Sequence, residues 1–404
     1  MTIAQISLSP LPASPNVDPA TFPKDFGRVV TGFDPANPQK DQIIDALYRV
    51  GAQLHALRPS ANSSAPGPPL PRPQAHTEAA AFDPEATSYG HGNNETGKQD
   101  KSVLHPDLKT IPHQPEVQLI GNGVVPGDHE GLSSHPHHKT FHKTVVSDEE
   151  DAAGVTRFYR WHIDAALYKL SPPKVTTLYA VKVPEGEQQT LRYDDGSGDE
   201  IKLPRGSTVF ACGENTFNIL PPPLKSLAVR TKVRYAPHPY VWMAGAKAQS
   251  TGLGLESDGT EIPLSELPDW TEDNVKVLPM LWKNPVTGRL ALQVHPCAAM
   301  ALEIAPLPEG AEREGALFPD GGKVTDLKEV RELLKTIQRP GIDPKFVFCA
   351  DWREGDLVLF HNRGLLHSVT GALRDDELRM FHQCNLAASS DPVGPTEEDV
   401  KQYA

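Results

Sequence analysis

The sequence lacks the features of several large classes of protein. It has four cysteines in 404 residues and no Cys-x-x-Cys pair, which argues against a disulfide framework and favours reduced thiols. No apolar run approaches the length of a membrane span. Basic residues number 39 against 52 acidic ones, and the net charge of −13 argues against a nucleic-acid-binding surface. No His-Glu-x-x-His motif is present, which disfavours a zinc hydrolase.

The beginning of the chain lacks the basic residues and the continuous apolar stretch of a secretory signal. Together with the absent membrane span, this favours a cytoplasmic protein with neither membrane nor nucleic acid among its partners. A chain of 404 residues could hold two or three average domains, but β-rich enzymes of this size often form a single one.

A His-x-Asp motif, formed by His162 and Asp164, lies at the end of the aromatic-rich stretch 158–164. Aromatic residues favour a strand, and residues two apart on a strand point to the same face. Both side chains can therefore reach one metal ion. Taken alone, the motif is explained better by a structural histidine on a polar strand, because His-x-Asp is short and common.

The second half of the pattern favours a metal site. His367 follows the short apolar run 357–360, which predicts a buried strand. Two imidazoles and one carboxylate are the ligand set of non-heme Fe(II) oxygenases, and this set leaves coordination positions open for a cosubstrate and O₂. On a further predicted strand, Arg379 shares a face with Gln383 and Asn385. An arginine there can hold a carboxylate through two parallel hydrogen bonds.

The order His-x-Asp, Asn-Arg-x-x-x-His and then an arginine resembles the Fe(II)/2-oxoglutarate dioxygenases of the taurine dioxygenase type, over most of the chain. The similarity is most extended to the fungal xanthine dioxygenases. It is carried by segments 87–92, 158–168, 236–240, 250–255 and 282–288. The family implies a double-stranded β-helix, and short strands with Gly/Pro turns and interspersed helices agree with a mainly β jelly-roll core with added helices.

The resemblance also implies a site. Fe(II) would be bound by His162, Asp164 and His367, and 2-oxoglutarate would bind the iron at one end. Its far carboxylate would pair with Arg379 and a threonine hydroxyl. Thr208 is preferred because a helix-like stretch follows it, as in the family. Thr190 also lies near the family spacing and is an alternative.

Within this family the fungal subgroup implies hydroxylation of xanthine at C8 to uric acid, with release of succinate and CO₂. Xanthine is edged with N–H donors and carbonyl acceptors, so amides that do both are expected around it. Gln383 and Asn385 are the first candidates. Glu150 and Asp151 could accept from purine N–H groups or form only a charged loop, and Lys143 could stabilise an anionic purine.

Two other functions fit the same residues. One is the same chemistry on a sulfonate or an aryloxy acid, whose negative charge would require a further basic residue beside the iron. The other is a catalytically inactive jelly roll that only binds ligands, which the intact ligand set and Arg379 disfavour.

One segment departs from the family. The range 55–76 is rich in proline, which fixes φ and removes a hydrogen-bond donor, whereas related dioxygenases have a buried strand and a helix about there. An insertion, a replaced segment and a gene-model error are the three explanations; the last is favoured, and sequencing the transcript across 51–82 tests it. The expected organisation is a loose lead-in over 1–24, one catalytic domain over 25–390 and a C-terminal tail over 391–404.

Overall fold

The protein is described by a computed structural model. The described residues are 6–12, 14–24, 26–32, 40–49, 54–57, 81–88, 109–111, 114–123, 141–371, 373–374 and 377–404. Most of the proline-rich range 55–76 lies outside them. Among the helices of these ranges, none is long and apolar enough to cross a membrane.

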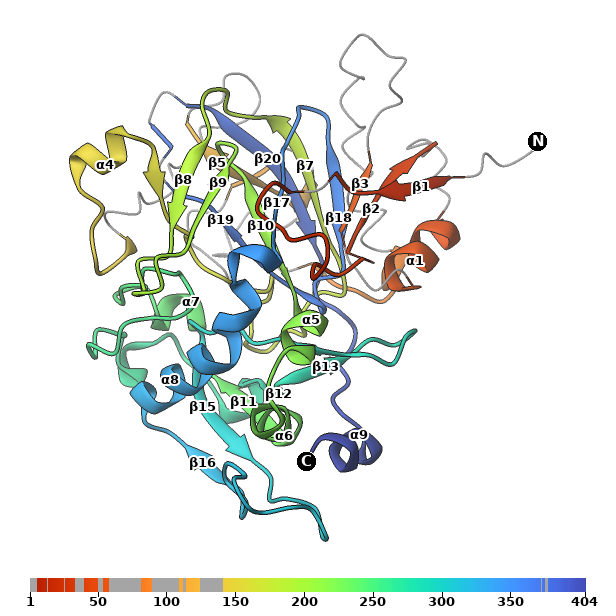
Figure 1. Ribbon diagram of the computed structural model, residues 1–404, viewed down its shortest axis with the longest axis vertical. Helices are drawn as coiled ribbons and strands as arrows, with labels where there is room; N and C mark the ends of the chain where they lie inside the picture. Colours follow the sequence, from red (N-terminus) through yellow and green to blue (C-terminus); the bar gives the residue numbers. More distant parts are fainter. Residues whose placement is uncertain are drawn as a thin grey trace.

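An eight-stranded sheet forms one layer of the fold (Figure 1). In sheet order its strands are β1 (Ser7–Pro10), β2 (Arg28–Thr31), β3 (Leu54–Leu57), β18 (Leu357–Phe360), β7 (Thr176–Lys182), β20 (Arg379–Asn385), β5 (Gln114–Asn122) and β4 (Lys109–Ile111). All neighbours are antiparallel except β2 and β3. The strand predicted at 357–360 is confirmed as the fully buried β18.

A second layer packs against this sheet. Its strands are β17 (Val347–Cys349), β10 (Thr208–Cys212) and β19 (Leu365–Val369), extended by β6 (Val155–Thr156), β8 (Gln189–Arg192) and β9 (Glu200–Leu203). Between the layers, Phe210 of β10 packs against Phe360 of β18 with ring centroids 5.4 Å apart. Two sheets that bury their apolar faces against each other form the core of a jelly roll, as predicted.

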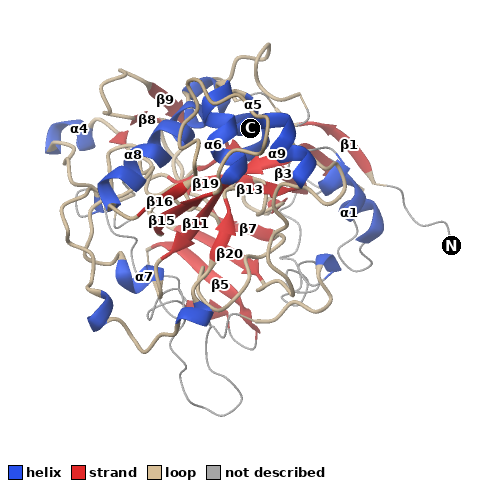
Figure 2. Ribbon diagram, turned by 90° about the horizontal axis from the view of Figure 1, so that it is seen from below, coloured by secondary structure: helices blue, strands red, loops and turns tan. Residues whose placement is uncertain are grey.

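The remaining elements lie outside these two layers (Figure 1). The strands are β12 (Val277–Pro279), β11 (Thr231–Tyr235), β15 (Ala299–Ile304), β16 (Gly322–Val324), β13 (Leu281–Lys283) and β14 (Leu290–Leu292). The helices are α1 (Lys40–Arg49), α4 (Asp148–Ala152), α5 (Gly213–Asn218), α6 (Pro222–Arg230), α7 (Pro239–Trp242), α8 (Leu327–Gln338), α9 (Glu397–Tyr403) and the 3₁₀ turns η1 (Leu264–Glu266), η2 (Glu272–Asn274), η3 (Arg339–Ile342) and η4 (Pro344–Phe346). Helices α5, α6, α8 and α9 lie together near the C-terminus (Figure 2).

Helix α8 shows how the sequence directs one of these elements. Asp326 begins it by accepting a hydrogen bond from the backbone N–H of Glu329 at 3.0 Å. Val330, Leu334 and Ile337 then recur at helical spacing and are buried. The amphipathic pattern at 324–337 therefore produces the helix that it predicts.

Three details differ from the sequence-based expectations. The lead-in 1–24 contains β1, which pairs with β2, and Asn16, whose amide donates to the carbonyl of Val347 at 2.7 Å. The tail 391–404 ends in α9, which is tied to the rest by an ion pair of Asp399 with Lys283 at 2.6 Å. Both ends find long-range partners, which local composition does not reveal. In the range 55–76, residues 55–57 belong to β3, which lies inside the sheet.

The stretch 158–164 differs from its expectation as well. Instead of a continuous strand it forms isolated bridges to the β19 side, at Phe158 and His162. On its other edge, the N–H of Trp161 donates to the carbonyl of Gly252 at 3.0 Å. Gly252 belongs to a loop rather than a strand, so the stretch 158–164 is not paired along this edge as a regular strand would be. The backbone nevertheless places His162 and Asp164 close together.

We expect Asp195→Asn to lower the free energy of unfolding by about 1 to 2 kcal/mol at pH 7. Asp195 lies in the turn between β8 and β9 and accepts from Arg339 Nε at 2.6 Å. Burial raises the pKa of Asp195, but hydrogen bonds from Arg339 and Ser197 more than offset this and lower it to about 2. The stabilisation by the ionised Asp195 carboxylate is fully present above the pKa that this group has in the unfolded chain, and it is lost as the pH falls from about 4 towards about 2. The unfolding temperatures of wild type and variant should therefore converge in acid.

The matched control is Asp320→Asn. Asp320 also pairs with an arginine, but its side chain is 86% exposed, so the change should leave the unfolding temperature within error. Equal stability of Asp195→Asn and wild type at pH 7 would contradict the first expectation.

Candidate metal centre and cosubstrate site

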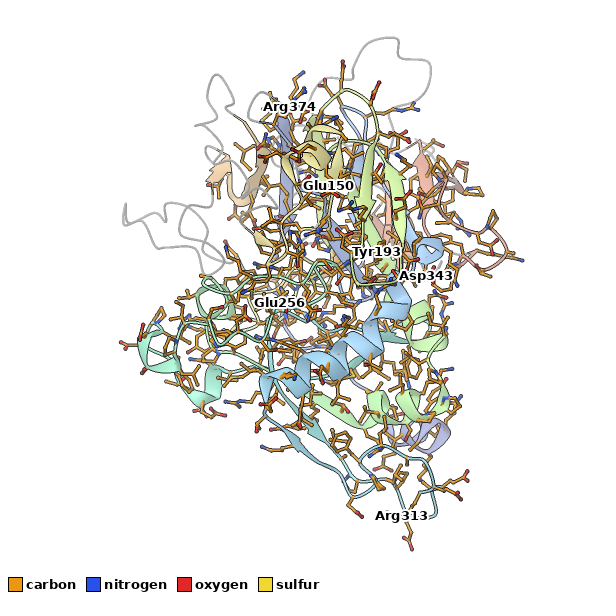
Figure 3. All side chains as sticks on the ribbon, turned by 60° about the vertical axis from the view of Figure 1, so that its left-hand side comes forward. Glu150, Tyr193, Glu256, Arg313, Asp343 and Arg374 are labelled. Carbon is orange, nitrogen blue, oxygen red and sulfur yellow. The ribbon has the colours of Figure 1, made fainter. Side chains whose placement is uncertain are left out.

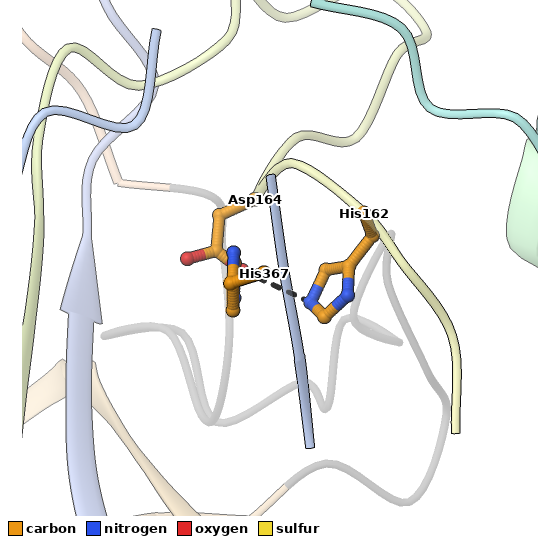
Figure 4. Close-up of side chains that lie close together, drawn as sticks. All are labelled: His162, Asp164 and His367. Atoms are coloured by element: carbon orange, nitrogen blue, oxygen red, sulfur yellow. Dashed lines mark ion pairs between the residues drawn. The ribbon is translucent and has the colours of Figure 1, made fainter. Parts of the chain in front are cut away.

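Three side chains converge, His367 from β19 and His162 and Asp164 from the segment that forms a bridge with it (Figure 4). His162 Nε2 lies 3.7 Å from Asp164 Oδ1, and His367 Nε2 lies 3.6 Å from the same oxygen. All three ligand atoms lie within 4.8 Å of one another. Among the described residues, no other set of three or more histidine, cysteine or carboxylate side chains brings its ligand atoms this close together. This is the trio predicted from the sequence.

Backbone hydrogen bonds fix the relative position of the ligands. His162 and His367 exchange N–H···O bonds of 2.9 and 3.0 Å, which places their side chains on the same face of the bridge. The Asn362 amide accepts from the N–H of Asp164 at 2.9 Å and donates to its carbonyl at 2.8 Å. The asparagine of the Asn-Arg-x-x-x-His motif thus holds the carboxylate ligand in register with the downstream histidine.

The side chains present free ligand atoms to the centre of the cluster. Asp164 Oδ2 accepts from Thr176 Oγ1 at 2.8 Å and from Gln383 Nε2 at 3.0 Å, which leaves Oδ1 available. His162 Nδ1 lies 2.9 Å from the carbonyl of Arg160. A carbonyl only accepts, so Nδ1 carries the proton and Nε2 has a free lone pair.

Burial also keeps the imidazoles neutral. It is the main cause that lowers the pKa of His162 below its usual value and that of His367 to about 3. Neutral imidazole is the form that binds metals. The donor set therefore fits one divalent ion: two neutral nitrogens and one carboxylate oxygen on one face, with the other positions open. The fold and this ligand set together define a mononuclear non-heme Fe(II) oxygenase.

Arg379 lies in the same interlayer space, at the start of β20. Its side chain is buried, Nε donates to the carbonyl of Gly206 at 2.9 Å, and Nη2 donates to Thr208 Oγ1 at 3.2 Å. Nη1 is buried without a partner, and within the described residues no carboxylate lies within ion-pair distance of this arginine. Burial lowers the pKa of Arg379 to about 9, which still leaves it charged at neutral pH. A buried cation without a counterion points to an anionic ligand.

Thr208 supplies a second unused donor beside Arg379. Its oxygen accepts from Arg379 Nη2 and from Trp352 Nε1, both at 3.2 Å. These two bonds occupy the acceptor capacity of the hydroxyl, so its own proton is left for an acceptor. Thr190 instead accepts from Lys202 Nζ at 2.5 Å on the β8–β9 hairpin. Of the two threonines weighed from the sequence, the structure brings Thr208 to the arginine.

The two predicted amides of β20 are buried near these groups. Gln383 contacts the ligand carboxylate of Asp164, as described above, and Asn385 Oδ1 accepts from Gln118 Nε2 at 3.1 Å. A role for Gln383 in orienting a metal ligand is a function that the sequence did not indicate, because the pairing joins residues far apart in the chain.

The predicted charged residues lie elsewhere. Glu150 lies on α4 (Figure 3) and pairs with Arg192 at 2.6 Å while capping its own helix. Asp151 follows it on the same short helix. Lys143 is 57% exposed and pairs with Asp258 at 2.7 Å. None of their described contacts is with the metal cluster.

Comparisons with known proteins agree with this class. The family model described as taurine catabolism dioxygenase TauD, TfdA family matches residues 123–385. The alpha-ketoglutarate-dependent xanthine dioxygenase xan-1 of Neurospora crassa is 50% identical over 403 residues, covering 96% of this chain and 90% of that protein. Its namesake xan1 of Schizosaccharomyces pombe is 48% identical over 380 residues, covering 93% and 87%.

A taurine dioxygenase structure from Burkholderia xenovorans has the same fold, with a TM-score of 0.53 and 17% identity, covering 96% of this chain and 91% of that one. The chain belongs to the TauD, TfdA family of dioxygenases.

Proposed function

We propose that this protein is an Fe(II)- and 2-oxoglutarate-dependent xanthine dioxygenase. Xanthine, 2-oxoglutarate and O₂ are converted to uric acid, succinate and CO₂: one oxygen atom enters C8 of the purine and the other enters succinate. The observation that carries the proposal is the pair of buried, unused donors of Arg379 and Thr208 in the same interlayer space as a His₂-carboxylate cluster. The similarity to xanthine dioxygenases over nearly the whole chain supports the substrate.

The residues of the site have separate roles in this reaction. His162, Asp164 and His367 hold the metal, and Fe(II) bound there supplies the redox chemistry that couples decarboxylation of 2-oxoglutarate to hydroxylation. Arg379 and Thr208 donate to the far carboxylate of 2-oxoglutarate and so orient the molecule. Thr176 and Gln383 keep the Asp164 carboxylate in a single orientation.

For the purine, we propose contacts with Gln383 and Asn385, supported by their burial on the strand that carries Arg379. Glu150, Asp151 and Lys143 stay part of the proposal. Glu150 and Lys143 would each have to exchange an existing ion pair for the substrate.

The test is reconstitution with Fe(II) without oxygen, followed by 2-oxoglutarate, O₂ and xanthine, with uric acid and succinate measured in parallel. Equal amounts of both products support the proposal. Succinate formed with a sulfonate or an aryloxy acid, and not with xanthine, would retain the family chemistry and replace the substrate. Absence of both products from a folded, iron-loaded protein would indicate an inactive jelly roll.

We expect Thr208→Val to raise the KM for 2-oxoglutarate about 10-fold, because one hydrogen bond to a charged carboxylate is lost. The matched control is Thr190→Val, which removes the same hydroxyl from the β8–β9 hairpin and should leave this KM unchanged. Steady-state succinate formation at varied 2-oxoglutarate checks both variants. An effect of Thr190→Val larger than that of Thr208→Val would reverse the assignment.

The organisation proposed with this function is one catalytic domain over 25–390, flanked by the segments 1–24 and 391–404. The proposed location is cytoplasmic, in keeping with the four cysteines, all of them within the described ranges, which are buried and form no disulfide.

A further inference from the structure

A second histidine beside the metal cluster has no role so far. His295 lies in the irregular connection between β14 and β15, and its side chain has no exposed surface. Among the described residues, neither ring nitrogen has a hydrogen-bond partner. Burial is the main cause that lowers the pKa of His295 well below its usual value, so the ring is neutral, with one N–H donor and one acceptor nitrogen.

The position of His295 connects it with the site. Its ring centroid lies 6.1 Å from that of His162, and 6.0 Å from that of Tyr240 in an edge-on arrangement. Tyr240 donates from its hydroxyl to the carbonyl of Ala165 at 3.2 Å, next to the ligand Asp164. His295 and Tyr240 thus lie against the segment that carries two of the three metal ligands, although neither belongs to the ligand cluster.

An unpaired buried imidazole is energetically unfavourable. Each buried polar group without a partner destabilises the folded state, and nearly all such groups in proteins are paired. Within the part of the chain that the structure describes, both nitrogens of His295 are unpaired, and Gln293, two residues earlier, is also fully buried with neither amide atom paired. Such groups are retained where a ligand completes their hydrogen bonds.

We propose that His295 binds the purine substrate through one ring nitrogen and so sets its orientation beside the metal. This inference rests on the proposed function and adds a contact to those of Gln383 and Asn385. A neutral imidazole suits a purine edge because it can donate to a carbonyl or accept from an N–H, whichever the bound edge presents.

The first variant is His295→Leu, which removes both nitrogens and keeps a similar volume. The dissociation constant of xanthine is measured by calorimetry without oxygen, with 2-oxoglutarate and a redox-inert divalent ion in place of iron. We expect it to rise about 10- to 100-fold, with a similar rise in the KM for xanthine, because the bound purine loses a buried hydrogen bond. Metal content and the KM for 2-oxoglutarate should stay within about twofold of wild type.

Two further variants keep the inference testable. His295→Gln and His295→Asn place an amide near the Nε2 and Nδ1 positions respectively, and one of them should recover most of the xanthine affinity. The control is His361→Leu, which removes another buried imidazole, one that packs on Tyr48 with ring centroids 5.1 Å apart. It should lower stability without changing xanthine binding.

Unchanged xanthine binding in His295→Leu, or equal loss of xanthine and metal binding, overturns the inference and leaves the proposed function intact. A wild-type protein that turns over 2-oxoglutarate but binds no xanthine overturns the proposed function, and the inference with it.

Discussion

Replacing His162 with alanine is expected to abolish uric acid and succinate formation together, by well over 100-fold, which exceeds the effect usual for residues that only orient a metal ligand. The variant leaves one nitrogen and one carboxylate oxygen, too few to hold an exchangeable divalent ion on one face. Equilibrium dialysis against Fe(II) or Mn(II) should show loss of the bound ion in parallel with loss of turnover.

The control for this variant is His382→Ala. His382 lies on β20, between Phe381 and Gln383, on the opposite face of the strand from Arg379. It should keep its metal and its product ratio. If the His162→Ala protein still bound one ion per chain with wild-type affinity, the assignment of His162 as a metal ligand would be wrong.

Replacing Arg379 with methionine should reduce the affinity for 2-oxoglutarate about 100-fold or more and change the stability of the ligand-free protein little. No carboxylate among the described residues pairs with this buried arginine, so its removal relieves an unfavourable charge while it costs the bonds to Gly206 and Thr208. In wild type, saturating 2-oxoglutarate should raise the unfolding temperature; in the variant this rise should disappear. Thermal unfolding at increasing 2-oxoglutarate concentrations measures both effects.

Arg230→Met is the control for Arg379→Met, and its expected effects on stability and on 2-oxoglutarate binding are the opposite ones. Arg230 is also buried, but it donates to backbone carbonyls, among them those of Ser226 and Leu317. Its loss leaves these carbonyls unpaired, so the protein should unfold at a lower temperature while 2-oxoglutarate binding is retained. If Arg379→Met lost stability as Arg230→Met does and kept its response to 2-oxoglutarate, Arg379 would be a structural residue.

The parts of the site predicted from the sequence are those that short motifs and periodicity encode. His162 and Asp164 are two residues apart, and the apolar run before His367 marks a buried strand, so the metal cluster follows from local pattern and resemblance. The jelly-roll core follows in the same way from the resemblance.

Long-range pairing was not predictable. No local signal joins Trp352 to Thr208, or Gln383 to Asp164, because each pair depends on how the two sheets face each other. For the same reason His295 has no motif around it: what sets it apart is that both of its ring nitrogens are buried with no hydrogen-bond partner among the described residues, which is a property of the folded chain.

The two hydrogen bonds between Asn362 and Asp164 also have a consequence for the order in which folding and metal binding occur. The two residues are 198 positions apart, and β18 and β19, on either side of Asn362, pair with strands from much earlier in the chain. Contacts over such separations form late and slowly, since a long loop must close first. We therefore expect metal binding to follow the pairing of these strands, because His367 and Asn362 reach His162 and Asp164 only after the intervening chain has folded back.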